Sequence, residues 1–166
     1  MCGLAGVLSE LRHGAVSFEV LRRMAAMLRH RGPDGYGLYR DDRIGLAHTR
    51  LSIVDLAGGA QPIHNEDRTV WVVFNGEIFN HVELRRELEA RGHRFYTRSD
   101  TEVIVHGFEE WGAAAWEHFN GQFAFALWDD RERRLWLVRD PLGILPLHYA
   151  RVGGRVVFAS EAKALF

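Results

Sequence analysis

The order of strand-forming and helix-forming segments along the chain constrains its fold more than any other feature. Runs of β-branched, aromatic and small apolar residues occupy both ends, and amphipathic segments typical of helices lie between them. The expected strands cover residues 3–9, a hairpin within 37–48, and residues 69–75, 122–129, 134–140, 147–151 and 155–160. Short turns join several of these runs, so we predict an α+β protein whose sheets are mainly antiparallel.

Three helices are predicted from the periodicity of their apolar residues and from residues that favour helix ends. The first begins after Ser17, a good N-cap residue. The second spans residues 80–92 and the third lies within residues 99–112. Ser99 and Glu102 have the spacing of a capping box, in which each side chain bonds to a backbone N–H at the start of a helix.

Composition limits the class of protein and its partners. The 166 residues are 47% hydrophobic, enough to build the core of one domain, and no linker divides them. With 21 basic and 22 acidic residues there is no basic surplus for nucleic acid or an anionic membrane. A single cysteine excludes an internal disulfide, and no segment is apolar enough for a signal peptide or a membrane helix. We therefore expect a cytoplasmic protein, and no local spacing of its histidines predicts a metal site.

The single cysteine is Cys2, directly behind the initiating methionine. If Met1 is removed, this residue carries both a thiol and a free α-amine, whose ordinary pKa is about 7.7–8.0. Such an amine can take the proton of the thiol beside it, so the residue supplies both a nucleophile and its base. The alternative is a small, buried apolar residue at the edge of a strand, and this stretch alone leaves both open.

Asn75 and Gly76 are candidates for stabilising an oxyanion, because a side-chain amide and a backbone N–H could converge on one oxygen. The alternative is a hairpin turn, which Asn-Gly favours strongly. Residues 80–92, however, are helical in pattern rather than strand-like. We therefore predict that the pair lies where a strand gives way to a helix and forms part of a site.

Arg50 and Asp100 could together hold an α-amino acid. A guanidinium can bind a carboxylate through two parallel hydrogen bonds, and a carboxylate can bind an ammonium group. Arg50 could instead be solvated, and Asp100 could simply favour the start of the third helix. Nothing in their spacing brings the two residues together.

Eight separated motifs give the chain a specific resemblance to a known family. In order they are MCGLAGVL, RHRGPDGYG, LAHTRLSIVDLAGGAQP, FNGEIFNHVELR, SDTEVIVHGFEEWG, GQFAFALWD, RDPLGILPLHY and FASEAKAL. The sequence is similar to the glutamine-hydrolysing N-terminal domain of asparagine synthetase-type amidotransferases, in which an N-terminal cysteine is the nucleophile. The resemblance covers nearly the whole chain.

This resemblance implies a fold and a role for each matching residue. The fold is the four-layer αββα sandwich of N-terminal-nucleophile hydrolases. Cys2 matches the nucleophile, Asn75 and Gly76 match the oxyanion hole, and the remaining matches are glutamine-binding residues: Arg50, Leu51, Ile53, Val54, Glu77 and Asp100. The implied reaction releases glutamate and ammonia through a thioester, and the domain itself needs no cofactor or metal.

The resemblance also implies a longer protein. The family passes its ammonia to a synthetase domain or subunit that uses ATP and Mg²⁺ to amidate a carboxylate, aspartate in the type member. No synthetase motif of the S-G-G-x-D-S type is present, so residues 1–166 are expected to be a glutaminase domain truncated at its C-terminal end. The acceptor and any homo-oligomer stay open.

Three positions depart from the family pattern. Leu145 stands where a lysine is usual, His148 where a tyrosine is usual, and Thr49 where a second arginine is frequent. None of them has an assigned role in catalysis. Two other functions remain possible: a non-catalytic module that binds an amino acid or supports a partner, and a hydrolase for another amide. The predicted pairing of Arg50 with Asp100 argues against the second.

Overall fold

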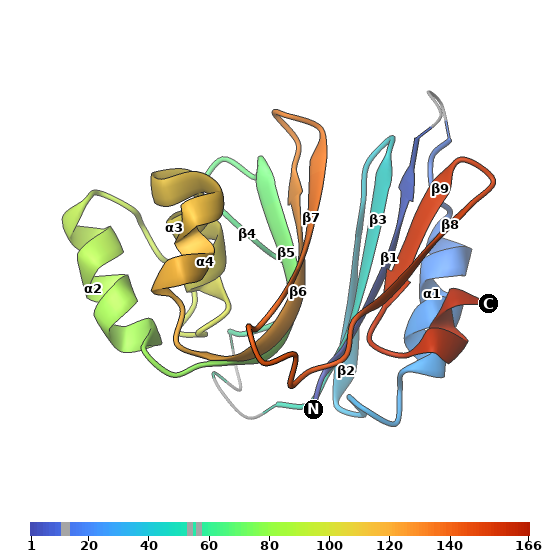
Figure 1. Ribbon diagram of the computed structural model, residues 1–166, viewed down its shortest axis with the longest axis horizontal. Helices are drawn as coiled ribbons and strands as arrows, with labels where there is room; N and C mark the ends of the chain where they lie inside the picture. Colours follow the sequence, from blue (N-terminus) through green and yellow to red (C-terminus); the bar gives the residue numbers. More distant parts are fainter. Residues whose placement is uncertain (11–13, 53–54, 56–57) are drawn as a thin grey trace.

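In the computed structural model, which describes residues 1–10, 14–52, 55 and 58–166, two β-sheets face each other and helices cover their outer sides (Figure 1). One sheet has the strand order β2-β3-β1-β9-β8 and the other β4-β5-β6-β7. All strand pairs within these sheets are antiparallel. The predicted αββα sandwich is therefore confirmed.

The elements follow the predicted order closely. The first sheet contains β1 (Gly3–Ser9), β2 (Gly35–Arg40), β3 (Ile44–Arg50), β8 (His148–Val152) and β9 (Arg155–Ala159). The second contains β4 (Ile63–His64), β5 (Val70–Ile78), β6 (Gly121–Asp129) and β7 (Arg134–Arg139). The helices are α1 (Phe18–Met27), α2 (His81–Ala90), α3 (Glu102–Trp111) and α4 (Ala115–His118), with short 3₁₀ turns η1 (Gly112–Ala114) and η2 (Ala162–Leu165). Among the described elements, the two-residue strand β4, the short helix α4 and the 3₁₀ turns η1 and η2 lacked predicted counterparts.

The start of α1 agrees with its sequence, whereas the start of α3 does not. Ser17 caps α1, because its hydroxyl accepts a hydrogen bond from the N–H of Val20 at 3.3 Å. The capping box predicted for α3 is wrong. The Glu102 carboxylate turns back to the preceding loop and accepts the N–H groups of Tyr96 and Thr97, each at 2.7 Å. These two hydrogen bonds occupy the carboxylate that a capping box would have used.

Apolar side chains fill the space between the sheets and the space under each helical layer. The inter-sheet core contains Leu4, Ile44, Leu46, Val73, Ala126, Trp128 and Phe158. On the other side of the second sheet, Phe74 and Phe125 pack in the cluster under α2 and α3. Strands β5 and β6 are thus buried on both faces, as the continuous apolar run around residues 69–75 predicts.

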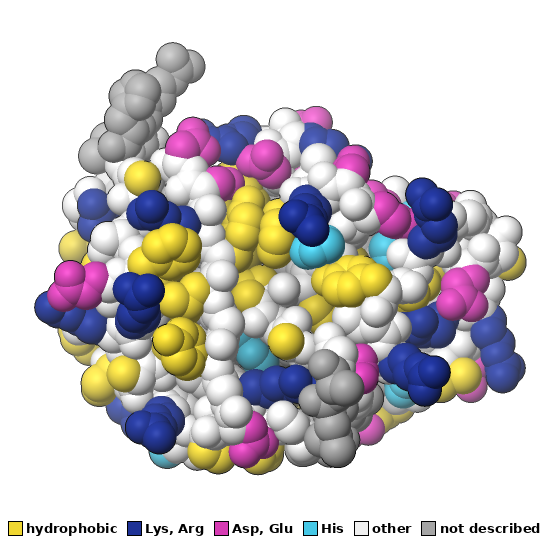
Figure 2. Space-filling model, turned by 180° about the vertical axis from the view of Figure 1, so that it is seen from behind, with side chains coloured by type: hydrophobic (Ala, Val, Ile, Leu, Met, Phe, Trp, Pro, Cys, Tyr) yellow, Lys and Arg dark blue, Asp and Glu magenta, His cyan; other side chains and the backbone are white. Residues whose placement is uncertain are grey.

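The surface is mixed in charge. Figure 2 shows acidic and basic side chains intermixed on the face opposite to that of Figure 1, in keeping with a net charge of −1. None of the described helices is long and apolar enough to cross a membrane.

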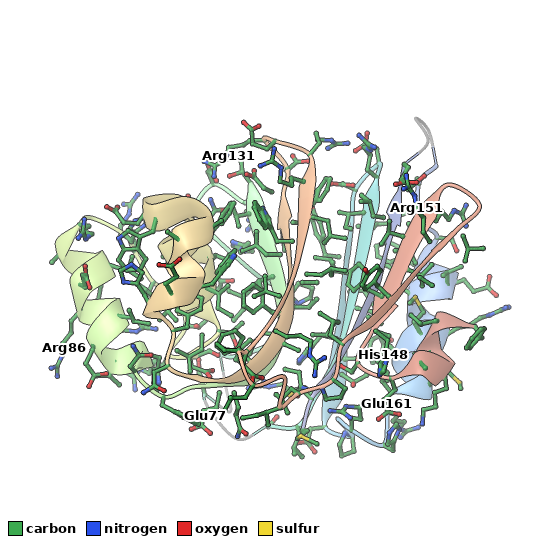
Figure 3. The ribbon with its side chains drawn as sticks, in the orientation of Figure 1. Glu77, Arg86, Arg131, His148, Arg151 and Glu161 are labelled. Carbon is green, nitrogen blue, oxygen red and sulfur yellow. The ribbon has the colours of Figure 1, made fainter. Side chains whose placement is uncertain are left out.

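The topology brings distant segments of the chain to one edge of the sandwich. Strand β1 is the central strand of its sheet, between β3 and β9. The N-terminus lies at the lower edge of the view in Figure 1, and Glu77, near the end of β5, lies at the same edge in Figure 3. Residues far apart in sequence therefore meet where β1 begins and β5 ends.

Candidate active site

A cavity of about 160 Å³ lies at this edge and is lined by most of the predicted site residues. Those that line it are Cys2, Arg50, Leu51, Asn75, Gly76, Glu77 and Asp100. Ile53 and Val54, predicted to contact a ligand through their backbone, lie outside the described residues. The structure thus brings together groups that no sequence spacing could connect.

Cys2 is half-buried and held by contacts to its sulfur and its carbonyl. The Leu51 N–H donates to Sγ at 3.4 Å, and Sγ lies 3.7 Å from the Leu51 carbonyl oxygen. The Arg31 Nε donates to the Cys2 carbonyl at 2.9 Å. Burial raises the pKa of the Cys2 thiol, against the opposing effects of the Leu51 hydrogen bond, the N-terminal ammonium and Arg50. The thiol therefore needs a base to become nucleophilic near neutral pH.

Asn75 presents an unused hydrogen-bond donor. Its side chain is only 1% exposed, yet Nδ2 has no hydrogen-bond partner among the described residues. A buried amide donor without a partner is costly and uncommon in folded proteins. Because Asn75 lines the cavity, an acceptor atom of a bound ligand could satisfy this donor.

The backbone conformation at position 76 requires a glycine. Its φ of 151° is rarely adopted by residues with a side chain, and an added Cβ would lie 2.2 Å from the Gln122 carbonyl oxygen. Asn75 and Gly76 do not form a hairpin turn, since β5 continues through them to Ile78. The strand-to-helix junction therefore lies a few residues later than predicted: Asn75 and Gly76 lie inside the strand, and α2 begins at His81.

Asp100 lies directly before the N-cap of α3 and is 4% exposed. One carboxylate oxygen accepts the Ile78 N–H at 3.0 Å, which ties the residue to the end of β5. Burial raises the pKa of Asp100, while the Ile78 N–H and His81 act in the opposite direction. A cationic partner in the cavity would offset the cost of this buried carboxylate.

Arg50 ends β3 and faces the same cavity. Its Nη2 donates to the backbone carbonyl of Asp55 at 2.5 Å. The Asp55 carboxylate in turn accepts the N–H of Arg98 at 2.8 Å, two residues before Asp100. The loops that carry the cationic and anionic groups of the cavity are thus connected to each other.

Sequence patterns missed two residues that shape the cavity. Gln61 received no role of its own from the sequence, but its Oε1 accepts the Phe74 N–H at 2.6 Å and its Nε2 donates to the Phe74 carbonyl at 3.1 Å. The Gln61 side chain therefore makes the two backbone hydrogen bonds to Phe74, next to Asn75, that a neighbouring strand would otherwise make. Leu145 is one of the three departures from the family pattern and had no assigned role; it is 5% exposed and lines the cavity.

Comparisons with known proteins agree with this arrangement. A family model described as a glutamine amidotransferase domain matches residues 1–166. Asparagine synthetase [glutamine-hydrolyzing] 1 of Bacillus subtilis is 44% identical over 99% of this chain and 26% of its own length. The corresponding enzyme of Zea mays is 43% identical over 99% of this chain and 28% of its own length. The chain thus spans about a quarter of the length of these relatives.

A solved structure shares the fold at lower sequence identity. The glutamine phosphoribosylpyrophosphate amidotransferase of B. subtilis, solved with ADP and GMP, aligns over 98% of this chain and 42% of its own, with a TM-score of 0.79 and 21% identity. The sandwich and its cavity define an amidotransferase domain of the N-terminal-nucleophile hydrolase fold. Within that class, the chain belongs to the glutamine amidotransferase domain family.

Proposed function

We propose that this chain hydrolyses glutamine to glutamate and ammonia through a thioester on Cys2. One observation carries the proposal: a single cavity holds a thiol, a buried amide donor with no partner in the described part of the chain, a guanidinium and a buried carboxylate. The first two groups suit cleavage of an amide, and the last two suit recognition of an α-amino acid.

The proposed base is the α-amine of Cys2 itself. Met1 lies against the cavity, and its removal would place a free amine on the residue that carries the thiol. Because burial raises the pKa of that thiol, a neighbouring base matters more here than for an exposed cysteine. An amine with a pKa of about 7.7–8.0 is partly neutral at physiological pH and can accept the proton.

The reaction then proceeds in two balanced stages. The thiolate attacks the side-chain amide carbon, and the oxyanion forms hydrogen bonds with the Asn75 amide and the Gly76 N–H. The Cys2 ammonium returns its proton to the departing nitrogen, so ammonia leaves and a glutamyl thioester remains. Water, deprotonated by the same amine, attacks the thioester; the C–S bond breaks and glutamate is released.

Arg50 and Asp100 are the proposed determinants for glutamine. Arg50 binds the α-carboxylate and Asp100 binds the α-ammonium, with Glu77 beside it at the exposed rim of the cavity. Backbone groups of residues 51–54 complete the contacts. The two ends of one amino acid are thereby fixed while its side-chain amide reaches Cys2.

The ammonia acceptor belongs to a larger assembly. The relatives at 43–44% identity are named asparagine synthetases, and each is several times longer than this chain. We propose that a C-terminal synthetase domain or subunit, using ATP and Mg²⁺, takes up the ammonia and amidates a carboxylate such as that of aspartate.

Release of glutamate and ammonia from glutamine by the wild type and by Cys2→Ala tests the reaction. We expect equimolar products from the wild type and none from the variant, together with an intact mass that lacks Met1. Equal release by both proteins would exclude Cys2 as the nucleophile. Glutamine binding without release by either protein would instead favour a non-catalytic binding module, and a retained Met1 in an active preparation would exclude the proposed base.

A further inference from the structure

A second group of ionisable side chains lies in the outer helical layer, away from the cavity. Glu66 belongs to the turn between β4 and β5, His93 to the segment after α2, and His106 and Glu109 to α3. One ligand atom from each of these four residues lies within 4.8 Å of all the others. We call them the Glu66–His93–His106–Glu109 cluster.

The distances within the cluster are longer than good charge-assisted hydrogen bonds, which measure about 2.7–2.9 Å. His106 Nδ1 lies 3.3 Å from Glu109 Oε2 and 3.5 Å from Glu66 Oε2. His93 Nδ1 lies 3.8 Å from Glu109 Oε2 and 3.9 Å from Glu66 Oε1. A tetrahedral Zn²⁺ ion with bonds of about 2.0–2.1 Å separates its ligand atoms by about 3.3–3.4 Å. The cluster therefore needs only small side-chain shifts to surround such an ion.

Two carboxylates outside the cluster contact its histidine rings and orient them. His106 Nε2 lies 3.4 Å from a Glu102 oxygen, and His93 Nε2 lies 3.4 Å from a Glu110 oxygen. Carboxylates on the far nitrogen of a histidine ligand are a common feature of metal sites, because they orient the ring.

The two carboxylates of the cluster are also hydrogen-bonded from outside. Asn65 Nδ2 donates to Glu109 Oε1 at 2.7 Å, and the Arg94 N–H donates to Glu66 Oε1 at 2.8 Å. Such bonds fix the direction in which each carboxylate presents its remaining lone pairs.

The local charge favours a bound cation. Glu66, Glu102, Glu109 and Glu110 surround the two histidines, and Arg91 is the basic side chain that pairs with Glu110.

We propose that the Glu66–His93–His106–Glu109 cluster binds one divalent transition-metal ion, for which Zn²⁺ is the natural probe. Two imidazole nitrogens and two carboxylate oxygens suit first-row metals such as Zn²⁺ rather than Ca²⁺ or Mg²⁺. Because four protein ligands complete a tetrahedron, the ion has a structural role. It ties residues 91–101, which include Asp100, to α3.

The test measures Zn²⁺ binding by titration calorimetry and equilibrium dialysis in a Cys2→Ala background. Cys2→Ala removes the only thiol, so the result does not depend on the proposed reaction. We expect one Zn²⁺ per chain and a higher thermal unfolding temperature with Zn²⁺ than with a chelator. Removing a hydrogen-bond partner of a metal ligand, with the ligand itself kept, lowers metal affinity by about 10–100-fold. His93→Gln and Glu66→Gln, which alter partly exposed ligands, should therefore weaken binding at least tenfold.

His118→Gln is the matched control, because His118 is an exposed histidine outside the cluster. It should bind Zn²⁺ like the parent. Co²⁺ in place of Zn²⁺ should give the visible absorption of a tetrahedral site in the parent and lose it in His93→Gln. Absence of saturable binding, or equal affinity in the parent and in folded His93→Gln and Glu66→Gln, would overturn the proposal. Either result would mean that the cluster is only a set of contacts between histidine and carboxylate side chains.

Discussion

At the scale of single residues, the Asn75 amide, whose Nδ2 has no partner among the residues that the structure describes, is the most informative group. A buried N–H group without a partner lowers stability, so its retention indicates a use for the donor. Preorganised hydrogen-bond donors stabilise a developing oxyanion without reorganising during the reaction. The proposed role of Asn75 therefore concerns the rate of the chemical step more than the binding of glutamine.

Replacing Asn75 by Ala should lower kcat for glutamine hydrolysis by about 10²–10³-fold, with a much smaller change in KM. Steady-state kinetics of purified protein measure both constants. Asn120→Ala, at an exposed asparagine outside the cavity, is the control and should behave as wild type. An unchanged kcat in Asn75→Ala would remove Asn75 from the oxyanion site.

Replacing Arg50 by Lys should act mainly on binding. A lysine keeps the charge but cannot make two parallel hydrogen bonds to a carboxylate. The lost charge-assisted bond is worth about 1.5–3 kcal/mol, so KM should rise by about 10–150-fold. Arg98→Lys, at an exposed arginine whose N–H bonds to Asp55, should leave KM unchanged. A normal KM in Arg50→Lys would contradict the proposed carboxylate contact.

Several residues that line the cavity could be predicted from the sequence as functional candidates. Their proximity in one cavity could not be predicted. Cys2 and the Asn75-Gly76 pair suggest chemistry by type and position, whereas Arg50 and Asp100 are ordinary residues until tertiary structure brings them to one cavity. The Glu66–His93–His106–Glu109 cluster was not predicted at all. Its ligands come from three separate segments, and only His106 and Glu109 have a local spacing.

At the scale of elements, His48 connects the two sheets. It lies on β3 and is fully buried, and its Nε2 is 3.1 Å from the Phe74 carbonyl oxygen on β5. Since a carbonyl only accepts, Nε2 carries the hydrogen and Nδ1 is the unprotonated nitrogen. Burial lowers the pKa of His48 to about 3, so the ring remains neutral in the fold at moderately acidic pH.

The folded protein should therefore lose stability as the pH falls from about 6.5 toward 3. Over this interval the unfolded chain protonates His48 and the folded chain does not, which lowers the free energy of unfolding by up to ~1.4 kcal/mol per pH unit. Urea unfolding of wild type and His48→Gln at pH 7.0, 5.5 and 4.5 measures this effect. We expect a smaller loss in the variant, and parallel losses would show that His48 does not titrate as stated.

Helices and strands were predictable because their signals are local. The alternation and turn residues of the hairpins, and the cap at Ser17, need no distant partner. The capping box at Glu102 failed for the opposite reason. Tyr96 and Thr97, in the loop before α3, offer two N–H groups to the same carboxylate, and no local pattern reports that competition.

At the scale of the whole molecule, Arg31 joins both ends of the chain. Its Nε donates to the Cys2 carbonyl and its Nη1 donates to Glu161 at 3.0 Å, while its side chain is 8% exposed. Burial of Glu161 opposes ionisation, but Arg31, His30 and Lys163 together lower its pKa to about 2. Glu161 precedes η2 and lies beside α1 in Figure 3. The position of the nucleophile thus depends on residues near the end of the chain.

Glu161→Gln should lower the free energy of unfolding by about 1–3 kcal/mol, because it leaves the largely buried Arg31 guanidinium without its charged partner. Urea denaturation at pH 7 measures the change. Glu19→Gln removes a fully solvated pair with Arg23 and should change stability by less than about 0.5 kcal/mol. Equal effects of the two substitutions would mean that the Arg31 pair is no stronger than a surface pair.

The central place of β1 has a consequence for biosynthesis. Its neighbour β3 leaves the ribosome well before its other neighbour β9, next to which the Ser160 N–H donates to the Leu4 carbonyl at 2.8 Å. At about 5–20 residues per second, the roughly 105 residues from the end of β3 at Arg50 to the start of β9 at Arg155 take about 5–21 s to translate. During that interval the first strand of the nascent polypeptide is paired on one side only, so its terminus stays open to an aminopeptidase before the nucleophile reaches its final position.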